Sequence, residues 1–569
     1  MKKYYILIFV LVASLGLSSC QSKFDLRSNG TIDMTDVFKD RNSIKGYLNA
    51  CYSYLSSVSP SINNGAYTDD AQHSQAITAG TSYDYWYNAG VTASNFASYN
   101  MDGDPWTNLW IGVRKCNVFL ANIDDATGDM TQSERQCWKA QAYVLRGYYY
   151  LQLIKRYGNV PLILEDLGTT HDFSSDTKAT ISAIATQIIS DCDAAIATPD
   201  GDDFSYFQTT LTWGMMTKAV AQAVRAETAM YAISPLLNDG FSKETALSVA
   251  ADALQQLLSH DYSLWTSEGA GVNAYATYYL TNPNDGRSAD KETIYGGSQV
   301  AVWSSCGIPT VAGTSTAGAC PTQELVDAYE MANGQVAITG YSDAAHLQPI
   351  INTASGYDAA KPYLNRDPRF YATIWYNGSK RGSTTINTAN GATCAINNTN
   401  IKYTHTGYYM RKYAHDNSNK NANFDGYIRT LRLTQVYYNF AEVAYQVSGP
   451  DTKVSGLNMS ARDAVNAVRA RVGQPEIPSG LSASDFETRY RNDRRVEFAL
   501  EGDRYFSLRR WKTLSGTSRV SGMTSTGERF AFDERPTCTD KYLLYPISIT
   551  EANKTQTLTG TSWQNAGWE

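Results

Sequence analysis

Residues 142–161 read AYVLRGYYYLQLIKRYGNVP, and this stretch says most about the fold. It belongs to a helix predicted over Lys139–Arg156, with three consecutive tyrosines at 148–150. Gly158 and Pro161 should end this helix, because both residue types terminate helices. The same segment places three small residues beside the large ones, namely Ala140, Ala142 and Gly147. Small residues let neighbouring helices approach closely, so the segment is typical of degenerate helical-hairpin repeats without a strict 34-residue period.

Helical periodicity continues on both sides of this segment. In Ser43–Leu55 the apolar residues recur at the i, i+3, i+4, i+7 spacing of one helix face. The other helices predicted in the first half are 106–123, 178–197, 213–234 and 243–259. Towards the C-terminus we predict helices at 431–447, at 461–472 with Ser460 as its cap, and after a capping box formed by Ser484-x-x-Glu487. A short strand is predicted at Tyr542–Ile547.

The first twenty residues have the pattern of an export signal. Lys2 and Lys3 precede a short apolar run, which ends in Leu17-Ser18-Ser19-Cys20. This order is typical of a bacterial secretory signal peptide, and a cysteine after the small residues predicts lipidation at Cys20. The run is too short for a transmembrane helix, which needs about 20 apolar residues. An ordinary signal peptide with a chance cysteine is the alternative.

The chain is therefore predicted to be mainly α, with a helical-hairpin scaffold and a loop-rich second half. Gly, Ser, Thr, Asn and Tyr dominate from about residue 262 to 430, where helical periodicity is poor. Loops of this kind are where binding residues concentrate. We divide the sequence into a lipoprotein signal peptide (1–19), an N-terminal helical part (20–262), a loop-rich ligand-facing part (263–430) and a C-terminal helical part (431–569).

Composition excludes some classes of protein. The net charge of −7 argues against nucleic-acid binding, which requires a basic surface. No CxxC pair is present, so zinc and thioredoxin-like sites have no support. Cys51, Cys116, Cys137 and Cys192 fall in predicted helices and are expected to be buried free thiols. The pair Cys306 and Cys320, across a small-residue loop, is the one candidate disulfide.

Many short motifs, in order along the chain, resemble one family. They are Trp110-Ile111-Gly112-x-x-Lys115-Cys116-Asn117, the segment 142–161, Pro321-Thr322-Gln323-Glu324-Leu325, Asn365-Arg366-Asp367-Pro368-Arg369, Arg411-Lys412-Tyr413, Asn439-x-Ala441-Glu442, Asn466-Ala467-Val468-Arg469-Ala470-Arg471, and Arg494-Arg495-x-Glu497-x-x-x-Glu501-Gly502-x-Arg504. Together with the lipoprotein signal they resemble the SusD/RagB family of nutrient-binding outer-membrane lipoproteins.

This resemblance implies a tetratricopeptide-like helical body, anchored in the outer membrane by lipid and facing the cell exterior. It implies a TonB-dependent, SusC-like transporter as partner and a polysaccharide or oligosaccharide as ligand. It implies neither catalysis nor a cofactor. Two alternatives stay open: a lid of the transporter that binds peptide or another nutrient, and, more remotely, a surface glycoside hydrolase.

Motifs for catalysis and metal binding fail on inspection. Gly313–Gly318 misses GxSxG by one position, and Gly269–Ala274 fits GxGxxA without a preceding strand. Asp416–Gly426 carries calcium-type ligands, but residue 420 is Lys where a ligand is needed, which favours a solvated loop. The charged block Arg494–Lys512 is interpreted as ion pairs of the scaffold, with Arg494–Glu497 and Glu501–Arg504 as i, i+3 partners. A phosphate-binding patch is the alternative for this block.

The strongest ligand-binding candidate is Tyr83-Asp84-Tyr85-Trp86-Tyr87-Asn88, bounded by Gly80 and Gly90. If this segment is extended, the tyrosines lie on one face and Asp84, Trp86 and Asn88 on the other. Trp86 would then stack on a sugar ring while Asp84 and Asn88 bind its hydroxyls. The resemblance adds Asp69 and Asp70 to this site. A second candidate cluster comprises Tyr275, Tyr278, Tyr279 and Trp303. For both clusters, packing of the loops onto the helices is the alternative.

Overall fold

The structure is a computed structural model. It describes residues 34–569 except 169, 208–213, 270–272, 284–289, 418 and 422–425. The predicted signal peptide and the lipidation site Cys20 lie outside the described residues. Within the described part of the chain, none of the helices has the length and apolar character needed to span a bilayer.

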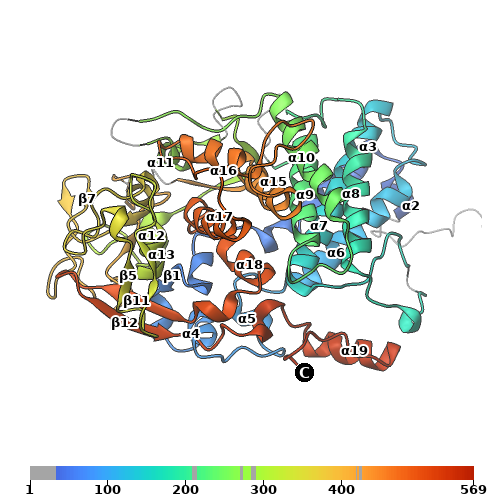
Figure 1. The fold of residues 1–569 in the computed structure, drawn as a ribbon. Helices are drawn as coiled ribbons and strands as arrows, with labels where there is room; N and C mark the ends of the chain where they lie inside the picture. The colour runs from blue at the N-terminus through green and yellow to red at the C-terminus, as the bar shows by residue number, and fades with distance from the viewer. Residues whose placement is uncertain are drawn as a thin grey trace, which may run out of the picture.

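A layer of antiparallel helices forms one end of the molecule (Figure 1). Each helix packs on the next in the order α6, α7, α8, α9, α10, α15, α16, and α3 packs on α6 and α7. Their bounds are α3 Arg41–Tyr52, α6 Pro105–Asn122, α7 Gln132–Tyr157, α8 Ile181–Ile196, α9 Lys218–Ala232, α10 Lys243–Ser259, α15 Leu433–Ser448 and α16 Ala461–Ala470. This order confirms the predicted mainly α, helical-hairpin scaffold.

Helix α7 shows why the opening stretch is helical. Thr131 and Glu134 form a capping box at its start, and Gly158 ends it with a φ of 68°. The glycine that sets the distance between α6 and α7 is Gly112, whereas a Cβ on the predicted Gly147 would make only ordinary contacts at 3.5 Å. A Cβ on Gly112 of α6 would lie 2.5 Å from the ring of Tyr149, so α6 and α7 can cross this closely only with glycine there.

Short elements and loops build the other end of the molecule. Its strands form two-stranded antiparallel pairs: β1 Ala71–His73 with β3 Ala319–Pro321, β2 Thr293–Gln299 with β10 Tyr427–Arg432, β4 Ile338–Tyr341 with β5 Pro349–Ile351, β6 Ile374–Trp375 with β9 Tyr409–Met410, β7 Lys380–Arg381 with β8 Thr384–Thr385, and β11 Arg519–Met523 with β12 Arg529–Glu534.

The remaining helices, from all parts of the molecule, are α2 Met34–Val37, α4 Ser82–Tyr87, α5 Phe96–Tyr99, α11 Ala274–Leu280, α12 Val302–Ser305, α13 Gln323–Ala328, α14 Pro368–Thr373, α17 Ala483–Glu497, α18 Asp503–Arg510 and α19 Ile549–Thr559. The 3₁₀ turns are η1 Leu55–Val58, η2 Asn64–Tyr67, η3 Ser74–Ile77, η4 Phe173–Ser175, η6 Thr353–Ser355, η7 Leu514–Thr517 and η8 Asp540–Leu543.

Two local predictions are wrong. Tyr542–Ile547 is not a strand, because the chain there continues from the turn η8. The cap of α17 is Ser482, whose hydroxyl accepts a hydrogen bond from the Asp485 backbone N–H, and not Ser484. The predicted cap Ser460 is confirmed at the start of α16.

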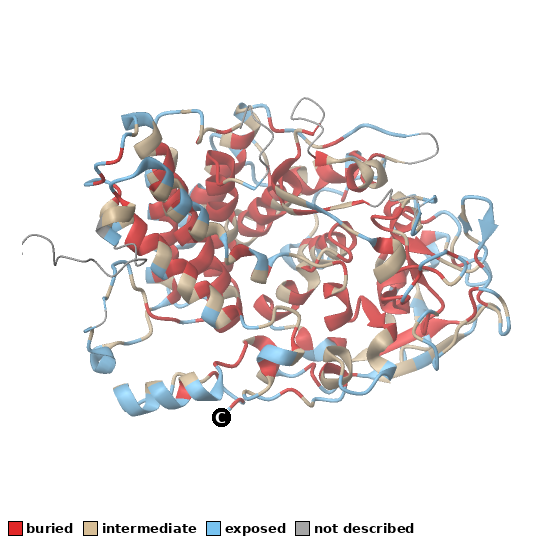
Figure 2. Ribbon diagram, turned by 180° about the vertical axis from the view of Figure 1, so that it is seen from behind, coloured by how far each residue is buried: buried red, intermediate tan, exposed pale blue. Residues whose placement is uncertain are grey.

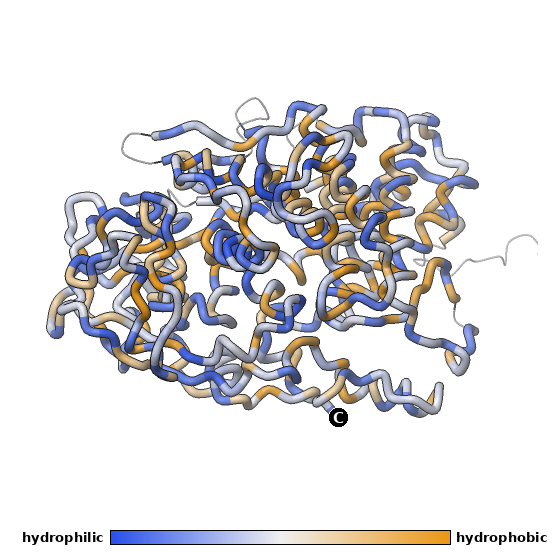
Figure 3. The backbone as a smooth tube through the Cα atoms, viewed as in Figure 1, coloured by the Kyte–Doolittle hydropathy of each residue, from blue (hydrophilic) through white to orange (hydrophobic). Residues whose placement is uncertain are grey.

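Two large hydrophobic cores fill the molecule, one among the helices and one in the loop-rich end. The buried residues follow the helices of the scaffold, whereas α19 is largely exposed (Figure 2). Helix α17 lies in the middle of the molecule although its sequence is hydrophilic (Figure 3). Its polar side chains must therefore find partners inside the protein.

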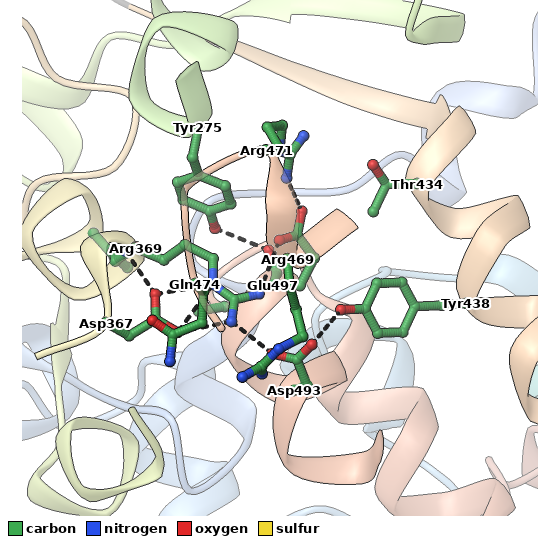
Figure 4. A network of polar contacts seen from close by, with 12 residues as sticks. Tyr275, Asp367, Arg369, Thr434, Tyr438, Arg469, Arg471, Gln474, Asp493 and Glu497 are labelled. Carbon is green, nitrogen blue, oxygen red and sulfur yellow. Dashed lines mark hydrogen bonds and ion pairs between the residues drawn. The ribbon is translucent and has the colours of Figure 1, made fainter. Parts of the chain in front are cut away.

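A buried network of ion pairs supplies those partners (Figure 4). Glu497 of α17 is fully buried and accepts hydrogen bonds from Arg369, Arg432 and Arg471, which come from three different segments. These guanidinium groups lower the pKa of Glu497 to about 2 against the effect of burial. One helix turn away, Asp493 binds Arg369 at 2.6 Å. This network joins the helical and loop-rich parts.

The network confirms that the charged block is scaffold, but the predicted partners are wrong. Arg494 pairs with Asp503 at 2.6 Å and not with Glu497. Arg504 pairs with Asp69 at 2.9 Å and not with Glu501. Local i, i+3 spacing therefore gave the correct role with the wrong contacts, because these side chains point towards other segments of the fold.

The candidate disulfide is absent. The eight cysteines among the described residues are free and buried. Cys306 Sγ donates a hydrogen bond to Asn63 Oδ1 at 3.1 Å. Burial raises the pKa of Cys306 to about 12 and that of Cys320 to about 11, so both remain thiols.

Candidate functional site

The segment predicted as the main ligand platform is a helix and not an extended strand. Thr81 caps α4 by accepting a hydrogen bond from the Asp84 backbone N–H at 3.2 Å. Asp84 in turn accepts from the Gly80 N–H at 2.9 Å and from the Asn88 side-chain amide at 2.9 Å. These bonds tie both ends of the short helix. Helical geometry redistributes the six side chains, so the predicted division into two faces does not hold.

Trp86 is part of the core. Its side chain is only 2% exposed and contacts the rings of Tyr67 and Tyr542 at centroid distances of 5.3 and 5.5 Å. Tyr87 is also buried, and its hydroxyl donates to the Ala66 carbonyl at 2.7 Å. The prediction that Trp86 stacks on a sugar is therefore wrong, because its ring anchors α4 to the molecule.

Asp69 and Asp70 are buried in ion pairs. Asp69 binds Arg504 at 2.9 Å and Arg495 at 3.0 Å, and Asp70 binds Arg495 at 2.7 Å. The arginines hold the pKa of Asp69 well below its usual range, whereas burial raises that of Asp70. The predicted role in ligand binding is wrong for this arrangement, because both carboxyl groups fix the loop before β1 to α17 and α18.

The aromatic surface of this region is formed by Tyr85. Its ring stacks on Tyr99 of α5 with a centroid distance of 3.7 Å and an angle of 6°, and both residues are partly exposed. Tyr83 stacks in the same way on His73, at 3.6 Å and 7°. Tyr99 was not predicted, because no spacing rule links it to a residue fourteen positions earlier. Its only signal was a tyrosine in a polar segment.

An open groove lies beside the C-terminal end of α4. It has a volume of about 530 Å³ and is lined by Tyr87, Asn88, Ser515, Ser518, Asp533, Glu534, Arg535, Pro536, Cys538 and Thr539. Asn88 is exposed at its rim. Arg535 fixes the wall by donating to the Ala71 carbonyl and to Gln72 Oε1, both at 2.8 Å. Figure 1 shows α4, α5 and β12 along one edge of the molecule, so the groove and the Tyr85–Tyr99 stack lie on neighbouring elements.

The groove offers the chemistry of a polar ligand site. Burial raises the pKa of Asp533, which lines the groove. Carboxylates, amides and hydroxyls can bind sugar hydroxyl groups, while stacked tyrosine rings offer an apolar face with a polar tip. Of the predicted residues, Asn88 lines the groove, Tyr85 contributes to the stack, and Asp84 holds Asn88.

The second predicted cluster is mostly interior. Tyr278 is fully buried, with its hydroxyl 2.9 Å from Thr293 Oγ1 and the guanidinium of Arg429 4.5 Å from its ring centroid. Tyr275 and Tyr279 are also buried, whereas Trp303 is half-buried. The tyrosines pack the loops onto the helices, so the cluster is not an open platform. The described residues contain no group of His, Cys, Asp and Glu arranged to hold a metal ion.

Comparison with known proteins identifies the family. A model described as the SusD family matches residues 272–568, more than half of the chain. The chain belongs to the SusD family. A second model, described as starch-binding associating with outer membrane, matches residues 29–209. Among curated proteins, none matches the sequence of this SusD-family chain.

Solved structures agree with this fold. A SusD-like protein from Bacteroides fragilis is 24% identical, with a TM-score of 0.73 over 93% of this chain and 98% of the other. A SusD-like carbohydrate-binding protein from Bacteroides fragilis is 20% identical, with a TM-score of 0.65 over 92% and 99%. A laminarin-binding SusD-like protein is 20% identical, with a TM-score of 0.55 over 93% and 100%. At these identities the likeness establishes the fold.

Proposed function

We propose that this protein is a glycan-binding lipoprotein of the outer membrane, anchored through Cys20 with its body facing the cell exterior. It captures a polysaccharide or oligosaccharide and delivers it to a TonB-dependent, SusC-like transporter. Support comes from the family description of starch binding at the outer membrane and from a structural relative that binds laminarin.

The observation that carries the proposal is the Tyr85–Tyr99 stack beside the groove rimmed by Asn88. An aromatic surface supplies contact area for the C–H face of a sugar ring, and the groove supplies acceptors and donors for its hydroxyls.

Titration calorimetry against soluble plant, fungal and host polysaccharides, laminarin among them, tests the proposal. We expect one glycan to bind, and Tyr99→Ala to weaken that binding about tenfold, which corresponds to ~1.4 kcal/mol. Phe173→Ala is the matched control, because Phe173 is 45% exposed on η4, outside the groove and the stack. The proposal would be contradicted if none of the glycans bound. It would also be contradicted if Tyr99→Ala and Phe173→Ala bound the glycan with equal affinity.

Delivery to a transporter needs a separate test. A tagged form of the chain, isolated from its own outer membrane in mild detergent, should carry with it a TonB-dependent β-barrel. Recovery of the chain alone, under conditions in which other outer-membrane complexes stay intact, would contradict the partnership.

A further inference from the structure

A second pocket lies in the loop-rich end, between α11 and the segment that follows β9. It shares no lining residue with the groove beside α4. Its volume is about 310 Å³, within the range of small-ligand sites. Its wall includes Ala276, Tyr279, Arg411, Lys412, Tyr413 and Asp416.

Arg411 brings to this wall a positive charge that no carboxylate among the described residues pairs with. Its guanidinium donates one hydrogen bond, to the Tyr371 carbonyl at 2.8 Å. None of the carboxylates in the described part of the chain lies within ion-pairing distance of it, whereas the buried Arg369 and Arg432 each have carboxylate partners. A half-exposed guanidinium with free N–H groups is suited to a planar carboxylate, which it can bind with two parallel hydrogen bonds.

Tyr413, the second residue after Arg411 in this wall, has a buried hydroxyl group and a strained backbone. Its side chain is 2% exposed, and its hydroxyl has no hydrogen-bond partner among the described residues. Its φ is +68°, which is rare for a bulky residue, and such strain is concentrated at functional sites. Its ring packs edge-on against Tyr279, with the centroids 5.3 Å apart.

The other charges of the wall are largely accounted for. Lys412 Nζ donates to the Tyr275 hydroxyl at 2.7 Å and to Ala499 O and Glu501 Oε1 at 2.8 Å each, so its charge is balanced inside the protein. Asp416 is exposed. Arg411 therefore remains as the cation of the pocket that a ligand can neutralise.

We propose that this pocket binds a carboxylated sugar unit, a uronic acid, through its carboxylate on Arg411. Tyr279 and Tyr413 line the pocket as almost fully buried residues that support its wall. This inference rests on the proposed glycan-binding function and assigns an acidic unit to the glycan.

The test compares short oligomers of galacturonate, glucuronate and mannuronate with neutral oligosaccharides of equal length, by titration of the purified protein. At least one uronate oligomer should bind, and Arg411→Gln should weaken it at least about tenfold. Arg114→Gln is the control, because Arg114 is a largely exposed arginine on α6, outside this pocket. Failure of all uronate oligomers to bind, or equal affinity of Arg411→Gln and wild type, would overturn the inference.

Two further variants separate this pocket from the groove and from simple structural roles. Tyr413→Phe should leave the uronate affinity and the melting temperature of the free protein unchanged, because the lost hydroxyl is buried and has no partner among the described residues. Tyr99→Ala should weaken neutral glycans and spare the uronate, so the two proposals can fail independently.

Discussion

At the scale of single residues, the aromatic side chains near α4 differ in role according to burial. Trp86 is closed off by Tyr67 and Tyr542, whereas Tyr85 and Tyr99 keep part of their rings exposed. The sequence shows four aromatics in five positions but not which of them point inward. That choice is made by α4 docking on the core.

Trp86→Ala should therefore act on stability. We expect a loss of about 3–5 kcal/mol in the free energy of unfolding, because a large buried ring is removed. Urea denaturation measures it, with Tyr99→Ala as the partly exposed control that should change stability much less. Near-wild-type stability of Trp86→Ala would show that the ring is not a core anchor.

Glu497 is the second residue whose role can be tested by itself. Glu497→Gln removes one negative charge from three buried arginines and should cost about 3–5 kcal/mol, because a buried partner is left uncompensated. Glu551→Gln, in an exposed i, i+3 pair with Lys554, should cost less than about 1 kcal/mol. Equal losses in the two variants would contradict the proposed importance of the network.

At the scale of elements, sequence periodicity predicted the long helices well. Helix α10, for example, has the predicted bounds, Lys243–Ser259, because capping and an apolar face are local properties. The site was predicted less well. The Thr81 cap of α4 is present in the sequence, but the polar flanks and the bounding Gly80 and Gly90 argue against a core helix. The partners of Asp69, more than 400 residues away, have no local signal at all.

The register of the α17 cap can be tested directly. Ser482→Ala should lower the free energy of unfolding by about 1 kcal/mol, because the N–H of Asp485 loses its acceptor. Ser484→Ala, two residues further along, should change it much less, since Ser484 is exposed and already inside the helix. Chemical denaturation measures both losses. A larger loss for Ser484→Ala than for Ser482→Ala would favour Ser484 as the cap, as predicted from the sequence.

At the scale of the whole molecule, buried titratable groups make the free energy of unfolding depend on pH. Burial lowers the pKa of His73 to about 3 and that of His405 to about 4. Both histidines are buried in the loop-rich end, where β1 and β3 pair. Arginine partners lower the pKa of Asp493 and Glu497 to about 2.

Stability should fall in acid in two stages. Between about pH 6.5 and 4 the histidines become protonated in the unfolded chain but stay neutral in the folded chain. The free energy of unfolding therefore decreases as pH falls. From about pH 4.5 towards 2 the paired carboxylates act in the same direction, because they protonate more readily when unfolded. Denaturation at a series of pH values checks this. His405→Phe should flatten the first stage, and an unchanged slope would contradict the assignment.

We propose that a glycan binds at the edge formed by α4, α5 and β12. Hydrogen exchange of the purified protein, with and without the tightest-binding glycan from the calorimetric panel, tests it most directly. We expect slower exchange of backbone amides in residues 84–99 and 533–539 when the glycan is bound. Protection confined to the helices of residues 105–157, or no protection anywhere at saturating glycan, would contradict it.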